Sequence, residues 1–357
     1  MLQNNNLTIL KNVIDNNIQH GFLWGDCKII LKQFPDECID CVITSPPYWK
    51  MREYDVNGPD FIGNEDDPND YVKNLVEIFS EVQRILTPKG SFWLNIGDKY
   101  YNKNLMGMPW RVALALQEKG WILRNDIIWN QLKGTQSSKD RLRNIYQHLF
   151  HFVKSKKYYY DYKKILIKPD QKPTISNGFV KSATGVSGIK YKQQIIESNA
   201  LSGLEKKNAL NALETTLERL RKGEIVDFRM TIRGQQRTLH SNTTTVSGRA
   251  KELQDKGYYI ITSHSDGYLP SDIWKIVPED EWRTDIHYAV FPVELLEIPI
   301  KATCPKNSLV LDPFMGTGST VMAALKFGCR GIGIEISEKY ITNAKSRMKK
   351  YQMRLNF

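Results

Sequence analysis

Strand-like apolar segments alternate with amphipathic helix-like segments in two parts of the chain, and this alternation restricts the fold more than any other feature. The β-branched run 38–44 predicts a buried strand that is stopped by proline. Segment 68–90 then carries apolar residues at helical spacing, and Pro88 and Gly90 are expected to mark its end. A strand, a helix and a strand follow at 91–98, 108–120 and 121–130. The alternation predicts an α/β fold with a mostly parallel sheet.

The same pattern returns toward the C-terminal end. Segment 307–328 reads as a strand, a glycine loop and a helix, and segment 329–337 as a further strand that ends in an acid. The part between the two alternating regions opens with a long stretch rich in Gly, Pro, Ser and Thr, which is typical of the entry to an inserted domain. We therefore expect one α/β domain, formed by 1–153 and 270–357, that is interrupted by an α+β insertion at 154–269.

The positive charge of the chain is concentrated in this insertion. Residues 154–256 contain 21 Lys and Arg against 10 Asp and Glu, a surplus equal to the +11 of the whole chain. Clustered cations favour a polyanion such as nucleic acid, because binding releases the counterions of its phosphates. An ordinary solubilising surface would have the same composition, so charge alone leaves both interpretations open.

Within the insertion, segment 204–222 predicts a helix with a leucine stripe, which is more often core than a partner-binding face. The stripe consists of Leu204, Leu210, Leu213, Leu217 and Leu220. Further on, four arginines stand among Gln, Ser and Thr, side chains that suit phosphates and base edges. These DNA-contact candidates are Arg229, Arg233, Arg237 and Arg249. The alternative is that all four are structural and hold the insertion on the catalytic domain through ion pairs.

The glycine loop DPFMGTGST lies between a strand and a helix. Asp312 ends the strand, and Gly316 and Gly318 let the backbone approach a ligand closely before the helix begins. Glu335 ends the next strand, where a carboxylate can accept both hydroxyl groups of a ribose. The spacing is not G-x-G-x-x-G, so a purely structural glycine turn remains an alternative. A P-loop is excluded because no Gly-Lys-Ser/Thr follows.

The stretch TSPPYW, which contains Ser45, Pro46, Pro47 and Tyr48, follows the first predicted strand. As structure alone, Pro-Pro would end a strand and Tyr-Trp would pack in the core. The stretch nevertheless lies at the C-terminal end of a parallel strand, where open α/β sheets bind their ligands. Its position favours a functional role.

Together the two motifs resemble those of the DNA amino-methyltransferases, which transfer a methyl group from S-adenosylmethionine to an exocyclic nitrogen. Ser45 to Tyr48 match the family signature of Asp, Asn or Ser followed by Pro-Pro and an aromatic residue, and DPFMGTG is similar to its cofactor motif. The order, with the catalytic motif first and the cofactor motif last, resembles the permuted beta class. The resemblance covers 20–165 and 270–350. It implies a Rossmann-like methyltransferase sheet, circularly permuted motif order and a target-recognition domain at 154–269.

The resemblance also implies a set of cofactor contacts for S-adenosylmethionine. Asp26 would lie beside the adenine, although a turn residue is an equal alternative there, and the segment around Phe291 and Pro292 would hold the methionine part. The full implied set is Asp26, Phe291, Pro292, Asp312, Phe314, Gly316, Gly318 and Glu335.

The chemistry of amine methylation explains why the TSPPYW motif contains these residues. The lone pair of a base amine is delocalised into the ring, so acceptors such as the Ser45 side chain and the Pro46 carbonyl are needed to aim it at the methyl group. The prolines hold this geometry rigid, and Tyr48 would stack on a base flipped out of the duplex. Ser at the first position resembles the cytosine-N4 branch of the family, so N4-methylcytosine is the expected product. Adenine-N6 is the main alternative, since Asp and Ser both offer an oxygen acceptor.

Two rivals from other classes remain at this point. A nicotinamide-dependent dehydrogenase would explain the glycine loop and Glu335, and a noncatalytic DNA-binding protein would explain the basic insertion. Neither explains TSPPYW. Cytosine-C5 methylation is disfavoured because Cys304-Pro305 has the reverse of the expected Pro-Cys order.

The remaining sequence features predict absences. The five cysteines are an odd number and include a single C-x-x-C pair, Cys38 and Cys41, while the six histidines show no metal-ligand spacing, so reduced thiols and no metal are expected. There is neither an apolar run of membrane-spanning length nor a secretory pattern at the start, so we expect a cytoplasmic protein without a membrane partner. Double-stranded DNA is the expected partner, and a cognate restriction endonuclease is left open.

Overall fold

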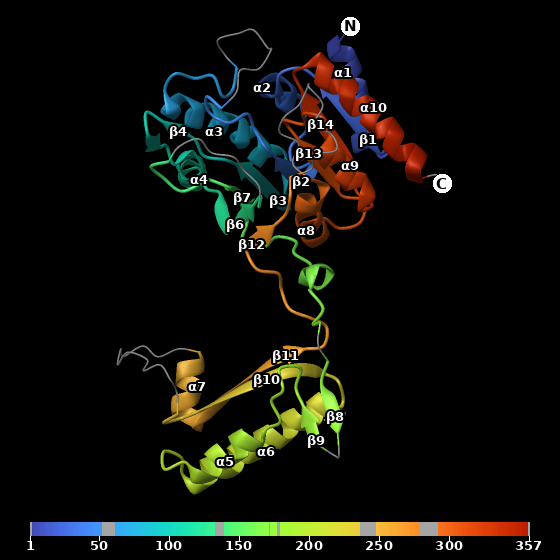
Figure 1. Cartoon of the computed structure of the whole chain (residues 1–357). Coiled ribbons are helices and arrows are strands. Elements are labelled where there is room, and N and C mark those ends of the chain that lie inside the picture. The colour runs from blue at the N-terminus through green and yellow to red at the C-terminus, as the bar shows by residue number, and fades with distance from the viewer. Residues whose placement is uncertain are drawn as a thin grey trace. The chain divides into compact units, whose positions relative to one another are not determined.

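The computed structural model describes residues 2–51, 61–132, 139–170, 172–176, 179–235, 248–278 and 292–355. The chain divides into two compact units. Unit 1 consists of Met1–Ile165 and Ser271–Phe357, and unit 2 of Leu166–Pro270. The elements of both units are labelled in Figure 1.

Unit 1 is built on an eight-stranded sheet in the order β1-β14-β13-β2-β3-β7-β6-β12. All of its strands run in one direction except β7, which is antiparallel to both neighbours. The strands are β1 (His20–Trp24), β14 (Arg330–Glu335), β13 (Leu309–Asp312), β2 (Ile39–Thr44), β3 (Leu86–Ile96), β7 (Tyr146–Val153), β6 (Ile122–Asn130) and β12 (Ile273–Lys275). The mostly parallel α/β sheet predicted from the alternation is confirmed.

Helices cover both faces of this sheet (Figure 1). Val42 and Phe92 point into a core shared with α3 and α4, whereas Ile43 and Trp93 pack in a second core with α8 and α9. Strands buried on both faces are typical of parallel sheets. The helices of unit 1 are α1 (Leu2–Ile14), α2 (Cys27–Ile30), η1 (Leu31–Gln33), α3 (Pro68–Ile85), α4 (Met108–Glu118), η2 (Tyr162–Ile165), α8 (Val293–Thr303), α9 (Ser319–Lys326) and α10 (Glu338–Leu355).

The boundary between α3 and β3 differs from the prediction. The helix ends at Ile85 and the strand begins at the next residue, so Pro88 and Gly90 lie inside β3 and do not mark the helix end. They lie where the pairing of β3 with β2 shifts register, an irregularity that tolerates proline. A side chain at Gly90 would come within 2.8 Å of the Asp40 carbonyl, so only glycine lets the strands approach here.

Three strands of the sheet, β1, β7 and β12, were not among the sequence predictions, whereas β2, β3, β6, β13 and β14 were. Inserting β7 between β3 and β6 brings its amino-terminal end to the edge where the other strands end. This edge receives the two sequence motifs. A small hairpin of β4 (Tyr100–Tyr101) and β5 (Asn104–Leu105) precedes α4.

Unit 2 combines a long antiparallel β-ribbon with helices. Its elements are β8 (Thr174–Ser176), β9 (Phe179–Lys181), α5 (Ile189–Glu197), α6 (Gly203–Arg221), β10 (Ile225–Ile232), α7 (Arg249–Lys256) and β11 (Tyr258–His264). Helix α6 starts with a capping box in which Ser202 and Glu205 each bind the other's backbone N–H. Ile195, Leu213 and Phe228 are buried between α5, α6 and the ribbon, which gives unit 2 its own core.

The leucine stripe predicted on α6 is largely inward-facing. Leu213 and Leu220 are buried, and Leu210 and Leu217 pack against the same core. Leu204 differs, because it lies in the first turn of the helix and is 69% exposed.

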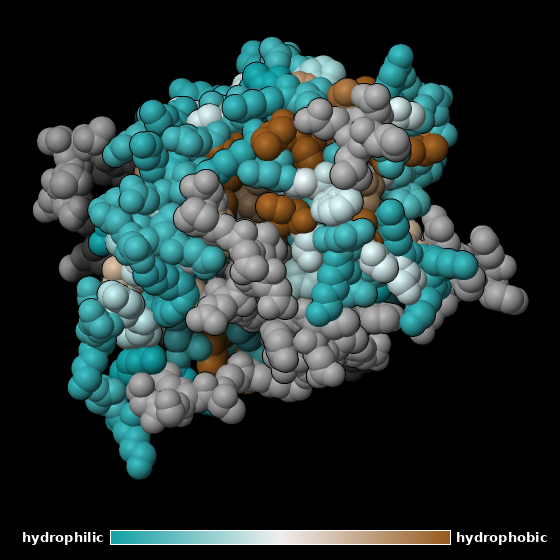
Figure 2. Space-filling model, turned by 90° about the horizontal axis from the view of Figure 1, so that it is seen from above, coloured by the Kyte–Doolittle hydropathy of each residue, from teal (hydrophilic) through white to brown (hydrophobic). Residues whose placement is uncertain are grey.

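Among the described residues no helix is long and apolar enough to cross a membrane. Seen from above, hydrophilic side chains cover most of the visible face, and a few apolar side chains gather near its centre (Figure 2).

Candidate active site

The two sequence motifs meet at the carboxyl edge of the sheet, because β13 and β2 are parallel neighbours with Leu311 opposite Val42. Asp312 and Thr44 end these strands, and the Thr44 hydroxyl donates to Asp312 Oδ1 over 2.6 Å. The glycine loop and the TSPPYW corner are therefore joined by a buried hydrogen bond.

The Asp312 carboxylate accepts hydrogen bonds from groups of the protein itself. It is 1% exposed and also accepts the Thr320 hydroxyl at 2.6 Å and the Phe314 backbone N–H at 3.0 Å. Burial raises the pKa of Asp312 to about 6, against the effect of these donors. The residue fixes the shape of the loop, and Phe314, only partly buried, follows it.

The loop itself requires its glycines. Gly316 and Gly318 have φ of 55° and 86°, the left-handed region that L side chains rarely adopt. Gly318 also lies against Ala344 of α10, where a Cβ would come to 3.3 Å. Arg347 of α10 stabilises the loop, because its guanidinium donates to the Thr317 carbonyl at 3.0 Å.

Glu335 ends β14 beside the loop, and each of its carboxylate oxygens accepts one backbone N–H. Gly316 donates to Oε2 and Ser337 to Oε1, both at 2.8 Å. A carboxylate oxygen can accept more than one hydrogen bond, so each keeps capacity for a ligand hydroxyl. Burial raises the pKa of Glu335 to about 7.

Asp26 follows β1 at the edge of the sheet where β14 ends, because Trp24 of β1 pairs with Glu335 and Asp26 comes two residues later. Its side chain accepts the Lys28 N–H at 2.8 Å and caps α2, and it is partly exposed. Pro292 is buried at the start of α8. Phe291 lies outside the described residues.

The TSPPYW corner is fixed from several directions. Tyr71 of α3 donates its hydroxyl to the Pro47 carbonyl at 2.9 Å, and Trp49 is 2% exposed with its indole N–H on the Glu65 carbonyl. Within the described part of the chain no donor lies on the Pro46 carbonyl, which stays available as an acceptor. Trp49 therefore packs in the core, while Ser45 and Tyr48 remain partly exposed.

Two amides that the sequence did not single out complete the corner. The Tyr48 hydroxyl donates to Gln147 Oε1 at 2.7 Å and lies 3.1 Å from the Ser45 hydroxyl. Asn95 Nδ2 lies 2.8 Å from both the Tyr48 hydroxyl and Gln147 Oε1, and 3.3 Å from Ser45 Oγ. Asn95 could have been singled out from the sequence, because it is a lone amide in an otherwise apolar strand. Gln147 could not, because β7, the strand that positions it, was not predicted.

The arginines of unit 2 fall into different environments. The Arg233 guanidinium is used inside the unit, since it contacts both Glu205 oxygens at 2.8 Å and the carbonyls of Ala200 and Gln254. Arg229 and Arg249 are exposed on β10 and at the start of α7. The fourth candidate, Arg237, lies outside the described residues.

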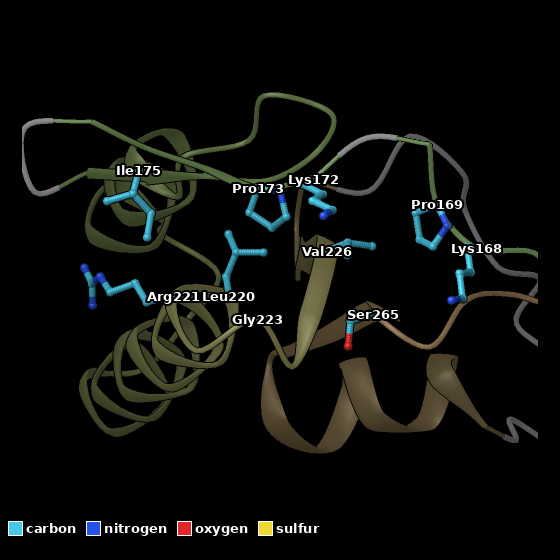
Figure 3. Close-up of a pocket in the computed structure, with 10 residues that line it drawn as sticks. All are labelled: Lys168, Pro169, Lys172, Pro173, Ile175, Leu220, Arg221, Gly223, Val226 and Ser265. Atoms are coloured by element: carbon cyan, nitrogen blue, oxygen red, sulfur yellow. The ribbon is translucent and has the colours of Figure 1, made fainter.

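Unit 2 also contains a pocket of about 350 Å³ between the loop before β8 and the end of α6. Its walls are mostly apolar, formed by residues such as Leu220 and Val226. Figure 3 shows Lys168 and Arg221 at opposite ends of it, with Lys172 between them. Arg221 is paired with Glu214 at 3.3 Å.

The described residues include no group of His, Cys, Asp or Glu side chains that could hold a metal ion.

A mostly parallel sheet with a glycine loop and an acid at its carboxyl edge is typical of α/β enzymes that bind a nucleoside-containing cofactor, and comparison with known proteins gives the family. Residues 39–346 match the N6_N4_Mtase family model, described as DNA methylase. The type II methyltransferase M.SfiI of Streptomyces fimbriatus is 30% identical over 376 residues, which cover 89% of this chain and 88% of that protein. The type II methyltransferase M.SmaI of Serratia marcescens is 28% identical, with coverage of 91% and 89%. The chain belongs to the DNA methylase family, as the two motifs predicted.

The solved structure of the PvuII DNA methyltransferase, titled cytosine-N4-specific, has the same fold. It superposes with a TM-score of 0.56 at 17% sequence identity and covers 92% of this chain and 86% of that one. The Rossmann-like methyltransferase fold expected from the resemblance is thereby confirmed.

Proposed function

We propose that this DNA methylase is a site-specific enzyme that transfers the methyl group of S-adenosylmethionine to the exocyclic N4 of cytosine in duplex DNA. The observation that carries the proposal is the hydrogen bond between Thr44 and Asp312. It joins the end of β2, from which Ser45 and Pro46 emerge, to the end of β13, from which the glycine loop emerges. The proposed acceptors of the target amine thus lie beside the proposed cofactor loop.

The residues at this edge fit S-adenosylmethionine. Glu335 offers two carboxylate oxygens with remaining acceptor capacity to a ribose, and the glycine loop offers a backbone surface without side chains at Gly316 and Gly318. Asp26 lies at the end of the neighbouring strand, in the position proposed for the adenine contact. The bound cofactor supplies an electrophilic methyl group on its sulfonium. Asp312 and Phe314 would shape the loop on which it lies.

The Ser45-Pro46 corner would prepare the nucleophile. The Ser45 hydroxyl and the Pro46 carbonyl accept the two N–H groups of the target amine, which localises its lone pair and directs it for in-line attack. Pro47 holds the backbone, with its own carbonyl fixed by Tyr71. Tyr48 stacks on the base after it has left the duplex.

Cytosine-N4 is proposed over adenine-N6 because Ser45 occupies the first motif position, where the cytosine branch of the family commonly has Ser. The cytosine-N4-specific title of the PvuII enzyme, a structural neighbour, supports the same choice. Adenine-N6 remains the second candidate, since the acceptors at the corner would serve either amine. The names of the type II relatives support a cognate restriction endonuclease as a biological partner.

Unit 2 is proposed as the target-recognition domain. It has a core of its own, and it carries most of the cations that the sequence concentrates between 154 and 256. Arg229 and Arg249 are the proposed DNA contacts, whereas Arg233 would stabilise the unit.

Sequencing of modified bases in DNA from cells that express the chain tests this function. We expect N4-methylcytosine at one short recognition sequence, and its absence from cells that express Ser45→Ala at the same level. N6-methyladenine in its place would select the second candidate. Unmodified DNA with a folded, expressed protein would reject the function.

A further inference from the structure

Ser45 poses a chemical problem that an acidic residue at the same position would not. An ionised carboxylate only accepts hydrogen bonds, whereas a serine hydroxyl both donates and accepts. If the Ser45 proton pointed at the target amine, it would compete with the N–H groups and withdraw the lone pair. The hydroxyl therefore has to be turned so that its oxygen, and not its proton, faces the substrate.

The hydrogen bonds around Tyr48 specify such a direction. Gln147 Oε1 can only accept, so the Tyr48 proton is committed to it across 2.7 Å. Of the pair Ser45 and Tyr48, 3.1 Å apart, only Ser45 then has a proton left to donate. This gives a chain of hydrogen bonds in which Ser45 donates to Tyr48 and Tyr48 donates to Gln147.

Asn95 fixes the polarity of this chain. Its Nδ2 lies 2.8 Å from Gln147 Oε1, which keeps the oxygen of Gln147 turned inward beside Tyr48. Reversing one amide alone would bring two like atoms within 2.8 Å. Reversing both would again leave an amide oxygen, that of Asn95, to take the Tyr48 proton. In the first arrangement the Ser45 proton points to Tyr48, and in the reversed one to Tyr48 or to the Asn95 oxygen 3.3 Å away, so it is directed into the protein in both.

Asn95 lowers the stability of the folded protein, and this penalty supports a functional role for its side chain. The residue is 2% exposed, and among the described residues its buried Oδ1 has no hydrogen-bond partner. A buried polar atom without a partner is destabilising, and an apolar side chain in this strand would avoid the penalty. A polar side chain is kept there at a cost to stability.

We infer that Gln147 and Asn95 are positioning residues that orient the Ser45 hydroxyl, through Tyr48, so that it acts as a pure acceptor toward the target amine. The inference rests on the proposed function, because it concerns the direction of a hydroxyl group in that same site. It adds a role for β7, the antiparallel strand that brings Gln147 to the carboxyl edge.

A double-mutant cycle tests the inference with the full-length enzyme and duplex DNA. Gln147→Leu removes the acceptor, so kcat should fall about 10- to 100-fold while the affinity for S-adenosylmethionine stays within about twofold. Gln147→Glu keeps an acceptor oxygen and should retain most of the activity. In a Tyr48→Phe background the chain is already broken, so adding Gln147→Leu should cost nothing further.

Ser91→Ala is the matched control, because Ser91 makes a buried 3.0 Å hydrogen bond to His151 across the same two strands, away from the corner. It should lower the melting temperature and leave kcat unchanged. Additive losses for Gln147→Leu and Tyr48→Phe, or an active Gln147→Leu, would overturn the inference while the function stands. A wild-type enzyme that transfers no methyl group to DNA would overturn the function and the inference together.

Discussion

Two buried carboxylates lie at neighbouring strand ends of the site, and their hydrogen bonds give them different roles at the scale of single residues. Asp312 accepts two hydroxyl groups and a backbone N–H, all from the protein. Glu335 accepts two backbone N–H groups from the described residues and has capacity left for a ligand. The first carboxylate builds the loop, and the second is the better candidate for direct cofactor contact.

Glu335 should make cofactor binding depend on pH. Burial raises its pKa to about 7, and ribose hydroxyls donate more strongly to the ionised form. The affinity for S-adenosylmethionine should therefore rise from pH 6 to pH 8, by up to about tenfold if ionisation is required. Glu335→Gln should bind more weakly and without this pH dependence in calorimetric titrations. Glu338→Gln, a change of an exposed carboxylate nearby, should behave like the wild type.

The same shift has the opposite sign for the stability of the ligand-free protein. A carboxyl group whose pKa is raised by folding binds its proton more tightly in the folded state, so stability falls as pH rises from the ordinary carboxyl range through about 7. Asp312, with its pKa raised to about 6, adds to this fall. Glu335→Gln should flatten the curve between pH 5 and 8, measured by chemical denaturation. An unchanged curve would show that Glu335 does not titrate there.

Tyr48→Ala should lower turnover and leave cofactor binding nearly intact, because the ring is assigned to the flipped base. Stacking is worth about 1 to 3 kcal/mol per base, so kcat/KM for DNA should fall by roughly 5- to 150-fold. Initial rates and calorimetry with S-adenosylmethionine separate the two effects. Wild-type rates would remove Tyr48 from the base pocket.

At the scale of elements, local patterns predicted the parts of the sheet that carry the motifs. The apolar run of β2, the glycines before α9 and the helical spacing of α3 are encoded in short segments, so their positions could be predicted. The insertion of β7 between β3 and β6 depends on pairing between distant segments, which no local pattern specifies. For that reason Ser45 and Glu335 could be proposed from sequence, whereas Gln147 could not.

Gly97, which follows β3, is predicted to help position Tyr48 in the TSPPYW corner. A Cβ at Gly97 would lie 2.8 Å from the Tyr48 ring, while no positive φ requires glycine there. Gly97→Ala should therefore displace Tyr48 and lower kcat several-fold, with a modest loss of stability. Gly203→Ala in α6, where nothing lies within 4 Å of an added Cβ, is the control and should leave kcat unchanged. Equal rates for both variants would show that the Tyr48 position is not critical.

At the scale of the whole molecule, the net positive charge is separated from the two motifs along the sequence, because it lies within 154–256, most of which belongs to unit 2, and the rest of the chain is neutral. The net charge of +11 equals the surplus within 154–256, so electrostatic attraction to DNA is expected to come mainly from that part. The separation lets binding and chemistry be changed independently. Substitutions in unit 2 should alter DNA affinity and its salt dependence without changing the affinity for the cofactor.

Arg229 and Arg249 should differ from Arg233 in this test. Replacing an exposed phosphate-contacting arginine by Ala should lower the slope of log affinity against log salt by about 1, and replacing a base-contacting arginine should cost about 1 to 3 kcal/mol on the cognate duplex. Arg233→Ala should instead destabilise unit 2, because it breaks the pair with Glu205. Titrations on cognate and scrambled duplexes, together with thermal melts, distinguish these outcomes. If neither exposed arginine alters slope, affinity or specificity, the DNA surface lies elsewhere.

The central claim is that the two motif corners form one site for methyl transfer to a base amine. Its most direct test is incubation of the purified enzyme with S-adenosylmethionine tritiated in the methyl group and cognate duplex DNA, followed by nucleoside analysis of the product. We predict label in N4-methylcytosine, and label reduced to a small fraction by Ser45→Ala even though that variant still binds the cofactor. Label on carbon 5 of cytosine, or equal transfer by Ser45→Ala, would contradict the account.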